Sequence, residues 1–539
     1  MPDQRSCAVF GEEILFAREV ILGTRAAWIV VLCSWVLILS VGGTGAEPSI
    51  SHEIVERLGV RELLVATPLA NYVFSEDGGT LRSILLTFAP YGSNVAELVA
   101  GTTSNASTLA RAYSVGAEFP FQLLHDDLAL RYVLQEPTYT ETGAIVVELK
   151  GTSGDWTVVK RFTIEPDALY TVSAEIELRG EGPQESPLRM VLSTYTPSAK
   201  GRQLTYLYDG EPLTQQLAPG SFFSFGGLGL MDNEVVLFLA PQEGTTVLPF
   251  AELTDEGSRR MGVELTAGGG SVSYQFLLYG GRRRYITLEA AGIEALDQTG
   301  VFARLMVYMI RFLDWLYLRT GNYGWAIILF TVLTRILLFP LMRKQYHSMA
   351  RMQQIQPLLK RVQARYKDNR EEMQRKILEI YRKERVNPMS GCLPMALQLP
   401  LIVLIWRALL YAAEQIHLSP GFLWVPDLSL HDPYYIFVVL TTLIMLLQQY
   451  FMAPMTPTES SGVQKYMGYF FPILMAFLLW RFPAGLWLYY LLTTVAQVGQ
   501  QAFVNWEMAR AGGGRVSLSD TEEVEPTSVD RGNDDGAPV

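Results

Sequence analysis

The chain has 539 residues, 49% of them hydrophobic, a formal net charge of −11 and a mean hydropathy of +0.17. Long apolar runs alternate with charged segments, which indicates a membrane protein with more than one domain and excludes a single soluble globule. The three cysteines, Cys7, Cys33 and Cys392, all lie outside the large polar segment, so that segment has no disulfide framework, and no Cys/His spacing resembles a zinc site.

Residues 1–46 contain one apolar run, residues 26–43, preceded by a start of mixed charge. Its length of eighteen residues favours a retained signal-anchor helix. Cleavage as a signal peptide stays open, because Thr44-Gly45-Ala46 loosely fits a small-x-small cleavage site.

Residues 47–295 have the composition of a soluble, β-rich domain. Turn signals such as Gly78-Gly79 and Asp209-Gly210 separate short stretches that alternate apolar and polar residues. These stretches are residues 62–67, 144–149, 171–178, 189–193, 235–239 and 271–278. We expect a sandwich-like all-β domain. It contains no Gly-rich phosphate loop and no nucleophile elbow, so we expect a packing or docking module.

Residues 296–320 change to a helical period. Leu305, Met309, Leu313 and Leu316 recur at steps of three and four residues, with charged residues between them. The position just before an apolar span predicts an amphipathic helix in the membrane interface. A helix packed on the β domain is the alternative.

Residues 323–342 form an apolar stretch of twenty residues, which is long enough to cross a bilayer core of about 30 Å. Arg335 lies within it, and an arginine at the centre of a spanning helix costs about 2.5–3.5 kcal/mol. Such a residue lies in a wet cavity, beside a partner, or where it can snorkel to the interface. Thr331 is one turn earlier on the same face and would share any cavity.

Residues 343–388 are basic and helical, with thirteen cations against five acidic residues, a net charge of +8. Residues 367–370 predict the turn of a helical hairpin, and Pro357 predicts the first turn of a new helix. In this arrangement apolar positions of the two helices face each other: Leu358, Leu359, Val362 and Tyr366 against Met373, Ile377 and Ile380. The excess of positive charge places this hairpin in the cytoplasm.

Four more spans are expected at residues 393–413, 434–451, 466–480 and 486–503. The loop 414–433 carries three acidic residues and no Lys or Arg, as a loop outside the cytoplasm should. Counting from a cytoplasmic N-terminus gives six spans with both termini in the cytoplasm, and Arg407 is then near enough to the outer face to snorkel. Residues 507–539 form a polar, acidic segment that we expect to be disordered.

Residues 322–506 contain many short motifs in one register. The motifs are Tyr323-Gly324-Trp325, Arg335 with Phe339-Pro340-Leu341, Gln345, Ser348, Met349, Gln356-Pro357, Asn387-Pro388 through Gly391-Cys392 to Pro394 with Gln398 and Pro400, Trp424, Asp427-Leu428, Asp432-Pro433-Tyr434-Tyr435, Phe482-Pro483-Ala484-Gly485-Leu486 and Tyr489-Tyr490. Together these motifs resemble the YidC/Oxa/Alb family of membrane protein insertases. The anchor, β domain and interfacial helix resemble the Gram-negative branch in architecture.

The resemblance implies a polytopic α-helical membrane protein with six transmembrane helices. Five of them form an insertase core at residues 321–506, and a periplasmic all-β domain is attached. It also implies a hydrophilic groove that is open to the cytoplasm and lined by Arg335, with Thr331, Gln398 and Tyr490 as further groove residues. Spans 393–413 and 466–480 resemble the helices that contact substrates.

The implied activity is insertion and folding of nascent membrane proteins in the bacterial inner membrane, alone or with the Sec translocon. The hairpin 343–388 would receive substrates and contact the ribosome or signal recognition machinery, or lie against anionic lipid head groups. One departure is the tail, which is basic in many family members and acidic here, and this argues against tail-mediated ribosome docking. No cofactor, metal or nucleic-acid readout is expected.

Two other classes of function compete with this interpretation. A solute transporter or channel with Arg335 in its pore should show internal repeats or paired interrupted helices, and neither is evident. An intramembrane enzyme should carry a catalytic set within its spans, yet His417 and His431 lie outside them without such partners. We therefore expect a protein that is not an enzyme.

Overall fold

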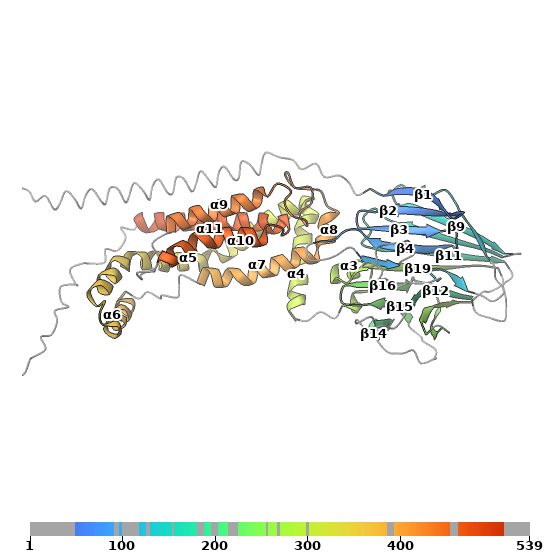
Figure 1. Ribbon diagram of the computed structural model, residues 1–539, viewed down its shortest axis with the longest axis horizontal. Helices are drawn as coiled ribbons and strands as arrows, with labels where there is room; N and C mark the ends of the chain where they lie inside the picture. The colour runs from blue at the N-terminus through green and yellow to red at the C-terminus, as the bar shows by residue number, and fades with distance from the viewer. Residues whose placement is uncertain are drawn as a thin grey trace, which may run out of the picture.

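A computed structural model describes most of the chain between residues 49 and 510. The described ranges are 49–90, 96–99, 118–124, 130–153, 156–180, 188–195, 203–213, 225–254, 257–266, 270–297, 301–384, 393–452 and 462–510. The expected anchor at 26–43, the motif residues 387–392 and the acidic segment beyond residue 510 lie outside them. A β-rich part and a helical part lie end to end along the long axis of the molecule (Figure 1).

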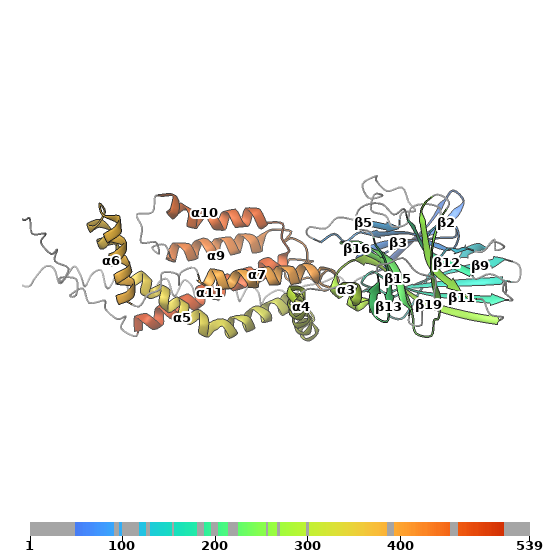
Figure 2. The ribbon, with the colours of Figure 1, turned by 90° about the horizontal axis from the view of Figure 1, so that it is seen from below.

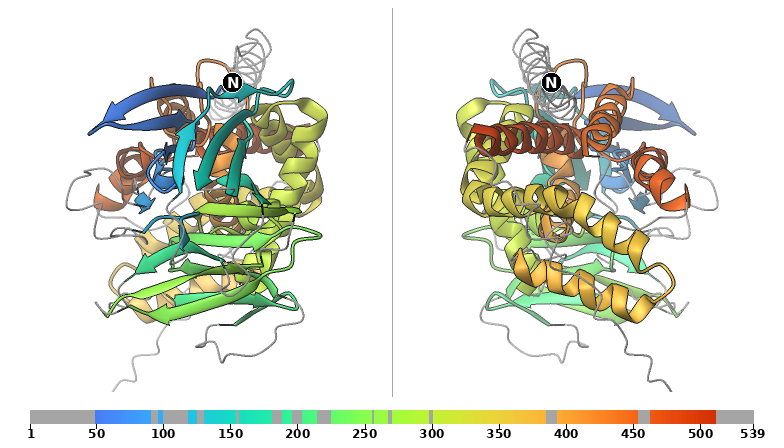
Figure 3. Two further views of the ribbon diagram at one scale, coloured as in Figure 1. Left: turned by 90° about the vertical axis from the view of Figure 1, so that its right-hand side faces the viewer. Right: turned by 90° about the vertical axis from the view of Figure 1, so that its left-hand side faces the viewer.

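Three antiparallel sheets make up the β-rich part. The first has the order β1-β2-β3-β4-β5, formed by Ser51–Arg57, Val60–Ala66, Ala70–Ser75, Thr80–Leu86 and Ala96–Val99. The hairpin between β1 and β2 turns at Leu58 and Gly59, which both have positive φ, and it extends to one side of the molecule (Figure 3). Such a turn suits the twist of a two-residue hairpin.

The second and largest sheet has the order β14-β13-β15-β16-β19-β11-β10-β9-β7, with β8 also paired to β9. Its strands are β7 Arg131–Leu134, β8 Thr138–Tyr139, β9 Ile145–Ser153, β10 Trp156–Ile164, β11 Thr171–Gly180, β13 Gln203–Tyr208, β14 Glu211–Leu213, β15 Phe225–Met231, β16 Val235–Pro241 and β19 Gly270–Arg282. Alternate residues of β9 and β11 are buried, as a strand with one face on the core requires.

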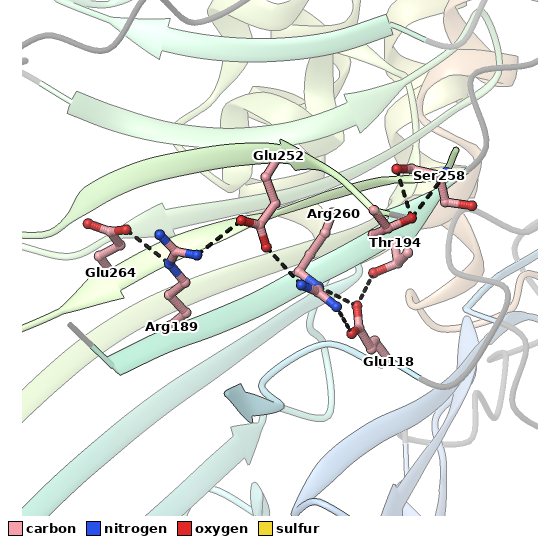
Figure 4. Close-up of polar contacts among 8 residues, drawn as sticks. Glu118, Arg189, Thr194, Glu252, Ser258, Arg260 and Glu264 are labelled. Atoms are coloured by element: carbon pink, nitrogen blue, oxygen red, sulfur yellow. Dashed lines mark hydrogen bonds and ion pairs between the residues drawn. The ribbon is translucent and has the colours of Figure 1, made fainter. Parts of the chain in front are cut away.

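The third sheet, β17-β18-β12-β6, is formed by Leu248–Leu253, Arg259–Leu265, Leu188–Tyr195 and Leu123–Leu124. A row of ion pairs crosses it, with Arg189 between Glu264 and Glu252, and Arg260 between Glu252 and Glu118 (Figure 4). Burial alone would raise the pKa of Glu118, but hydrogen bonds from Arg260 and Thr194 outweigh burial and lower the pKa. All six strands expected from the sequence are present in these three sheets.

Lys160 of β10 is a fully buried cation in the core of the β-rich part. Its Nζ donates to the carbonyl oxygens of Gly78 at 3.0 Å, Gly79 at 2.8 Å and Phe121 at 2.7 Å, and it lies 4.2 Å from the centroid of the Tyr132 ring. All three ammonium protons are therefore used to hold two loops against the sheet. Burial nevertheless lowers the pKa of Lys160 well below its ordinary value.

The helical part follows the last strand. Its elements are α3 Tyr285–Ala290, the 3-10 turn η1 Glu294–Leu296, α4 Val301–Thr320, α5 Tyr323–Arg365, α6 Arg370–Lys383, α7 Leu393–Tyr411, α8 Ala413–His417, α9 Ile436–Met452, α10 Gly462–Leu479 and α11 Ala484–Arg510. The long helices α5, α7, α9, α10 and α11 run along the molecule, whereas α4 crosses their direction next to the β-rich part (Figures 1 and 2). α4 buries Met309, Leu313 and Leu316 in the helical core and exposes Tyr308 and Trp315.

Two expectations about helix bounds are wrong. α5 continues without interruption through Pro340 to Arg365, so Pro357 lies inside a helix and does not begin one. A proline costs a helix one backbone hydrogen bond, and here burial of Ile355 and Leu359 against Ile377 and Ile380 of α6 offsets that loss. The hairpin turn itself is present between Arg365 and Arg370, with Asn369 as the N-cap of α6.

The second correction concerns the end of the last helix, because residues 507–510 continue α11 and are not part of a disordered tail. Glu507 accepts a hydrogen bond from Arg343 Nε at 3.1 Å and lies 3.5 Å from His347 Nε2. This ion pair between α11 and α5 fixes the last turn of α11.

Within the described residues, one stretch, Tyr323–Ser348 of α5, is both long and apolar enough to cross a membrane. Three shorter apolar stretches are Gln398–Tyr411, Ile436–Gln449 and Tyr469–Leu479. The last expected span lies within α11, where Gln497, Gln500 and Gln501 lower the hydropathy. The expected number of six spans therefore stays a prediction.

The two parts of the molecule meet at α8. Glu414, which is fully buried, accepts a hydrogen bond at 3.2 Å from Arg284, the residue that precedes α3. The same guanidinium donates to the carbonyl oxygen of Leu410. His417 stacks on Phe88 with ring centroids 4.2 Å apart. The start of the acidic loop 414–433 is thus a buried junction with the β-rich part.

Candidate functional site

Arg335 lies in the middle of the helical core and is only 6% exposed. α5 turns Thr331, Arg335 and Gln345 inward, while Leu333, Ile336 and Leu337 are exposed on its other side. This division follows the period of 3.6 residues per turn, so the apolar stripe can face lipid while the arginine faces other helices. Arg335 is therefore a buried cation, which excludes the alternative that it snorkels to the interface.

Arg335 is bound to α7 by one hydrogen bond. Its Nη2 donates to Oε1 of Gln398 at 3.0 Å. The Nε2 of the same amide donates to the hydroxyl of Tyr489 on α11 at 3.2 Å. Three helices thus contribute one side chain each to a buried chain of hydrogen bonds, and the amide oxygen of Gln398 is oriented toward the guanidinium.

Arg335 keeps an unused donor, because Nη1 is buried and has no hydrogen-bond partner among the described residues. The Arg335 charge also has no acidic partner in the described part of the chain. A guanidinium pairs best with a carboxylate in a planar arrangement. The described residues therefore leave one buried N–H group of the guanidinium, and its positive charge, unpaired.

Other buried polar atoms lie on the same helices. Gln345 Oε1 on α5, and Thr493 Oγ1 and Gln500 Oε1 on α11, are buried without a partner among the described residues. α5 and α11 pack against each other, so these atoms extend the polar character of the core along the helix pair. Native cores contain few such groups, so their alignment along one helix pair is a distinctive feature of this bundle.

The four residues expected at the site differ in what the structure assigns to them. Arg335 and Gln398 are in direct contact. Thr331 is buried on the expected face, but its hydroxyl donates to the carbonyl oxygen of Ile327 at 2.7 Å, within its own helix. Tyr490 is half-buried and its ring lies 6.1 Å from that of Trp487. Their roles as groove residues stay predictions.

Tyr489, not Tyr490, supplies the hydroxyl that completes the chain of hydrogen bonds, and no sequence pattern favours one tyrosine over the other. On α11, Tyr489 begins a polar stripe with Thr493, Gln497 and Gln500, at steps of three and four residues. A second stripe one residue later, beginning at Tyr490 and Thr494, has the same spacing. Only burial distinguishes the two, since Tyr489 is fully buried.

Helices around this site expose apolar side chains to their surroundings. On α10 these are Phe470, Phe471, Ile473, Phe477 and Leu478. α10 lies at the edge of the bundle, beside α9 (Figure 2). The predicted substrate-contacting span 466–480 therefore belongs to a helix with a broad apolar face.

The site has no arrangement for covalent catalysis. Its described members are a guanidinium, amides and hydroxyl groups, without a general base beside a nucleophile. The described residues also contain no group of three or more His, Cys, Asp or Glu that could hold a metal ion. The described side chains of the site offer hydrogen-bonding groups and one positive charge.

Comparison with known proteins finds a matching family and several relatives. The model of the family described as "60Kd inner membrane protein" matches residues 315–511. A membrane protein insertase YidC from Oleidesulfovibrio alaskensis is 30% identical over 484 residues, which cover 84% of this chain and 86% of the relative. A membrane protein insertase YidC from Syntrophus aciditrophicus is 29% identical over 489 residues, covering 83% and 85%.

A solved structure agrees with the fold. It is described as an active YidC insertase with the first transmembrane domain resolved, and it aligns with a TM-score of 0.52 over 84% of this chain and 94% of that chain. At 21% identity this likeness bears on the fold alone. Taken with the relatives, whose identity extends over both the β-rich and the helical parts, these findings show that the chain belongs to the YidC family of membrane protein insertases.

Proposed function

We infer that this protein is an insertase and chaperone of the bacterial inner membrane, which inserts and folds integral membrane proteins. The observation that carries this inference is the 30% identity to a membrane protein insertase over 84% of the chain. The buried polar site in an apolar helix bundle supports this inference, since such a site offers a polar segment a favourable environment within the membrane.

Arg335 is the proposed receptor for the polar, acidic end of a nascent chain. Its unpartnered Nη1 and the absence of an acidic partner in the described residues leave its charge available to a carboxylate. In a low-dielectric wall a fixed cation attracts a carboxylate more strongly than it does in water. Drawing the acidic end partway inward shortens the polar distance that remains to be crossed.

The apolar segment of the substrate then leaves sideways into lipid. The exposed apolar faces of α5 and α10 offer a path, and each buried CH₂ group contributes about 0.8 kcal/mol. Insertion by this route requires no cofactor. We propose that Thr331, Gln398 and Tyr490 line the hydrophilic groove with Arg335, and that the groove opens to the cytoplasm.

The topology that this mechanism needs has six spans, both termini in the cytoplasm and the β-rich part in the periplasm. The basic hairpin of α5 and α6 then lies in the cytoplasm, where it meets nascent chains, the ribosome or signal recognition machinery. α4 then lies in the interface on the periplasmic side of the inner membrane, a position that its exposed Tyr308 and Trp315 favour. The Sec translocon is the proposed partner for larger substrates.

Depletion of the protein tests the function. Insertion of a small substrate with one or two spans is scored by protease protection before and after depletion, and again after the wild-type chain is restored. We expect insertion to fall on depletion and to recover on restoration. Normal insertion in depleted membranes would refute the proposed function.

A further inference from the structure

The α5–α6 hairpin presents cations that have no counter-charge in the described residues. Exposed cations without an ion-pair partner in that part of the chain are Arg351, Lys360, Arg361, Lys367, Arg370 and Arg382. We call them the basic face. By contrast, Arg375 and Lys376 on α6 pair with Glu372 and Glu379 of the same helix. The positive charge of the basic face is therefore not neutralised within the described residues, and such a surface attracts anions.

The chain carries an anionic segment of suitable size. Residues 511–539 contain seven acidic side chains and two arginines, and four of the acidic residues fall within residues 520–525. This segment follows α11 directly, so it starts on the same side of the membrane as the hairpin.

Covalent geometry permits the two to meet. α11 ends beside α5, since Glu507 bonds to Arg343, and Arg361 is eighteen residues further along α5, or about 27 Å. Asp520 is ten residues past the end of α11, and ten extended residues span up to about 33–36 Å. A tether of this length holds a segment at an effective concentration on the order of millimolar.

We propose that the acidic segment, residues 520–535, binds the basic face of its own chain and shields it from other polyanions. This goes beyond insertion at Arg335, because it concerns access to the cytoplasmic hairpin. A nascent chain with many carboxylates, or a nucleic acid, then has to displace the segment before it reaches α5 and α6. A weak intramolecular contact suffices for this shielding, since the tether keeps the segment close to the basic face.

Crosslinking tests the contact directly. Val524→Cys, between Glu523 and Glu525, and Ala364→Cys, exposed between Arg361 and Arg365, leave every charge in place. The three native cysteines are changed to serine, and the full chain is held as one copy in a nanodisc of neutral lipid. We expect a short bismaleimide to join the two positions at low salt. The yield should fall when Asp520, Glu522, Glu523 and Glu525 become the corresponding amides, and in about 0.5 M salt, where charges are screened within a few ångströms.

A binding measurement tests the shielding. The probe is a fluorescent oligouridylate, whose affinity for the nanodisc-held chain is measured by anisotropy. Neutralising the four acidic residues should strengthen binding roughly five- to tenfold at low salt, as removal of a weak tethered competitor should. The matched control changes Ser517, Ser519, Thr521 and Thr527 to alanine and should leave the affinity unchanged.

Two results would each overturn the proposal, and so would the third named below: an absence of salt-sensitive crosslinking, or equal probe affinity with and without the four charges. A crosslink that persists after neutralisation would likewise show that proximity does not depend on charge. Neither measurement involves insertion, so these results leave the insertase function untouched.

Discussion

Replacing Tyr489 by phenylalanine should disable the site without removing the arginine. The hydroxyl of Tyr489 is the acceptor for Nε2 of Gln398 at 3.2 Å, and Gln398 is only 7% exposed. Without that acceptor the amide either keeps a buried, unpaired donor or rotates and presents its NH₂ group to Arg335. Both outcomes remove a defined orientation of the guanidinium.

The magnitude follows from the loss of one partner of a buried hydrogen bond, which costs about 1–3 kcal/mol. Part of this cost lowers the stability of the folded chain. If about 1.4 kcal/mol of it instead raises the barrier to insertion, insertion becomes tenfold slower. The effect should be concentrated in substrates with acidic ends, because these depend on the orientation of Arg335. Substrates with neutral ends should slow by much less.

The assay is insertion of one single-span substrate in two versions, with an acidic or a neutral end, into proteoliposomes that contain each variant. Tyr490→Phe is the comparison, because that tyrosine is half-buried and has no hydrogen bond to Gln398 or Arg335. Its effect should be the smaller. The reasoning fails if Tyr489→Phe inserts both substrates like the wild type, or slows both equally.

Three further predictions concern the rest of the molecule. Arg284→Met leaves the buried Glu414 carboxylate without its partner, which should cost about 3–5 kcal/mol and lower the thermal transition of the full chain, whereas Arg179→Met at an exposed pair should change it little. Equal shifts in the two variants would contradict the account of the junction. Burial lowers the pKa of Lys160, so the unfolded chain binds more protons between that lowered pKa and about 10.4, and stability should rise with pH in this window. Hydrogen exchange of β10 in the full chain measures this stability as a function of pH. Lys160→Met should abolish the rise with pH. A rise that is unchanged in Lys160→Met would show that another group causes it. Gly324→Ala places a methyl group in steric overlap with the Phe422 ring and should destabilise the start of α5 by about 1–3 kcal/mol, while a transition temperature equal to that of the wild type would show that the ring can move away.

Much of the fold was predictable because local patterns and burial agree. The strands β9 and β11 alternate polar and apolar residues and lie with one face on the core, so their sequence carries the signal. The uninterrupted α5 was not predictable. Pro357 has the local properties of a helix start, and only the tertiary contact of Leu359 with α6 decides otherwise.

The site was predictable in part for a similar reason. A single charge in an apolar span is visible in a sequence, so Arg335 could be identified, and Gln398 followed from the family resemblance. The contact partner Tyr489 could not be chosen over Tyr490, because adjacent helical residues differ by about 100° and both begin polar stripes. Glu414 falls in the predicted loop 414–433, and nothing in the sequence shows that Arg284, 130 residues earlier, reaches it.

The resemblance motifs also gain physical reasons from the structure. Asn322 caps α5 by accepting a hydrogen bond from the Gly324 amide at 2.8 Å. Asp432, fully buried, accepts from Trp424 Nε1 and from the amides of Tyr434 and Phe437, and so holds the end of the loop 414–433 at the start of α9. Both residues position helices that carry or surround the site.

The central claim is that the charge of Arg335 attracts acidic ends of substrates. A carboxylate at about 4 Å from a cation gains about 4 kcal/mol at an effective dielectric constant near 20, before desolvation is subtracted. The most direct measurement compares insertion of a substrate with an acidic, neutral or basic end by the wild type, Arg335→Lys, Arg335→Ala and Arg335→Glu. We expect Arg335→Lys to retain insertion, Arg335→Ala to impair the acidic substrate most, and Arg335→Glu to reverse the preference toward the basic end. A uniform loss for all three substrates would contradict the account and assign Arg335 a role in folding alone.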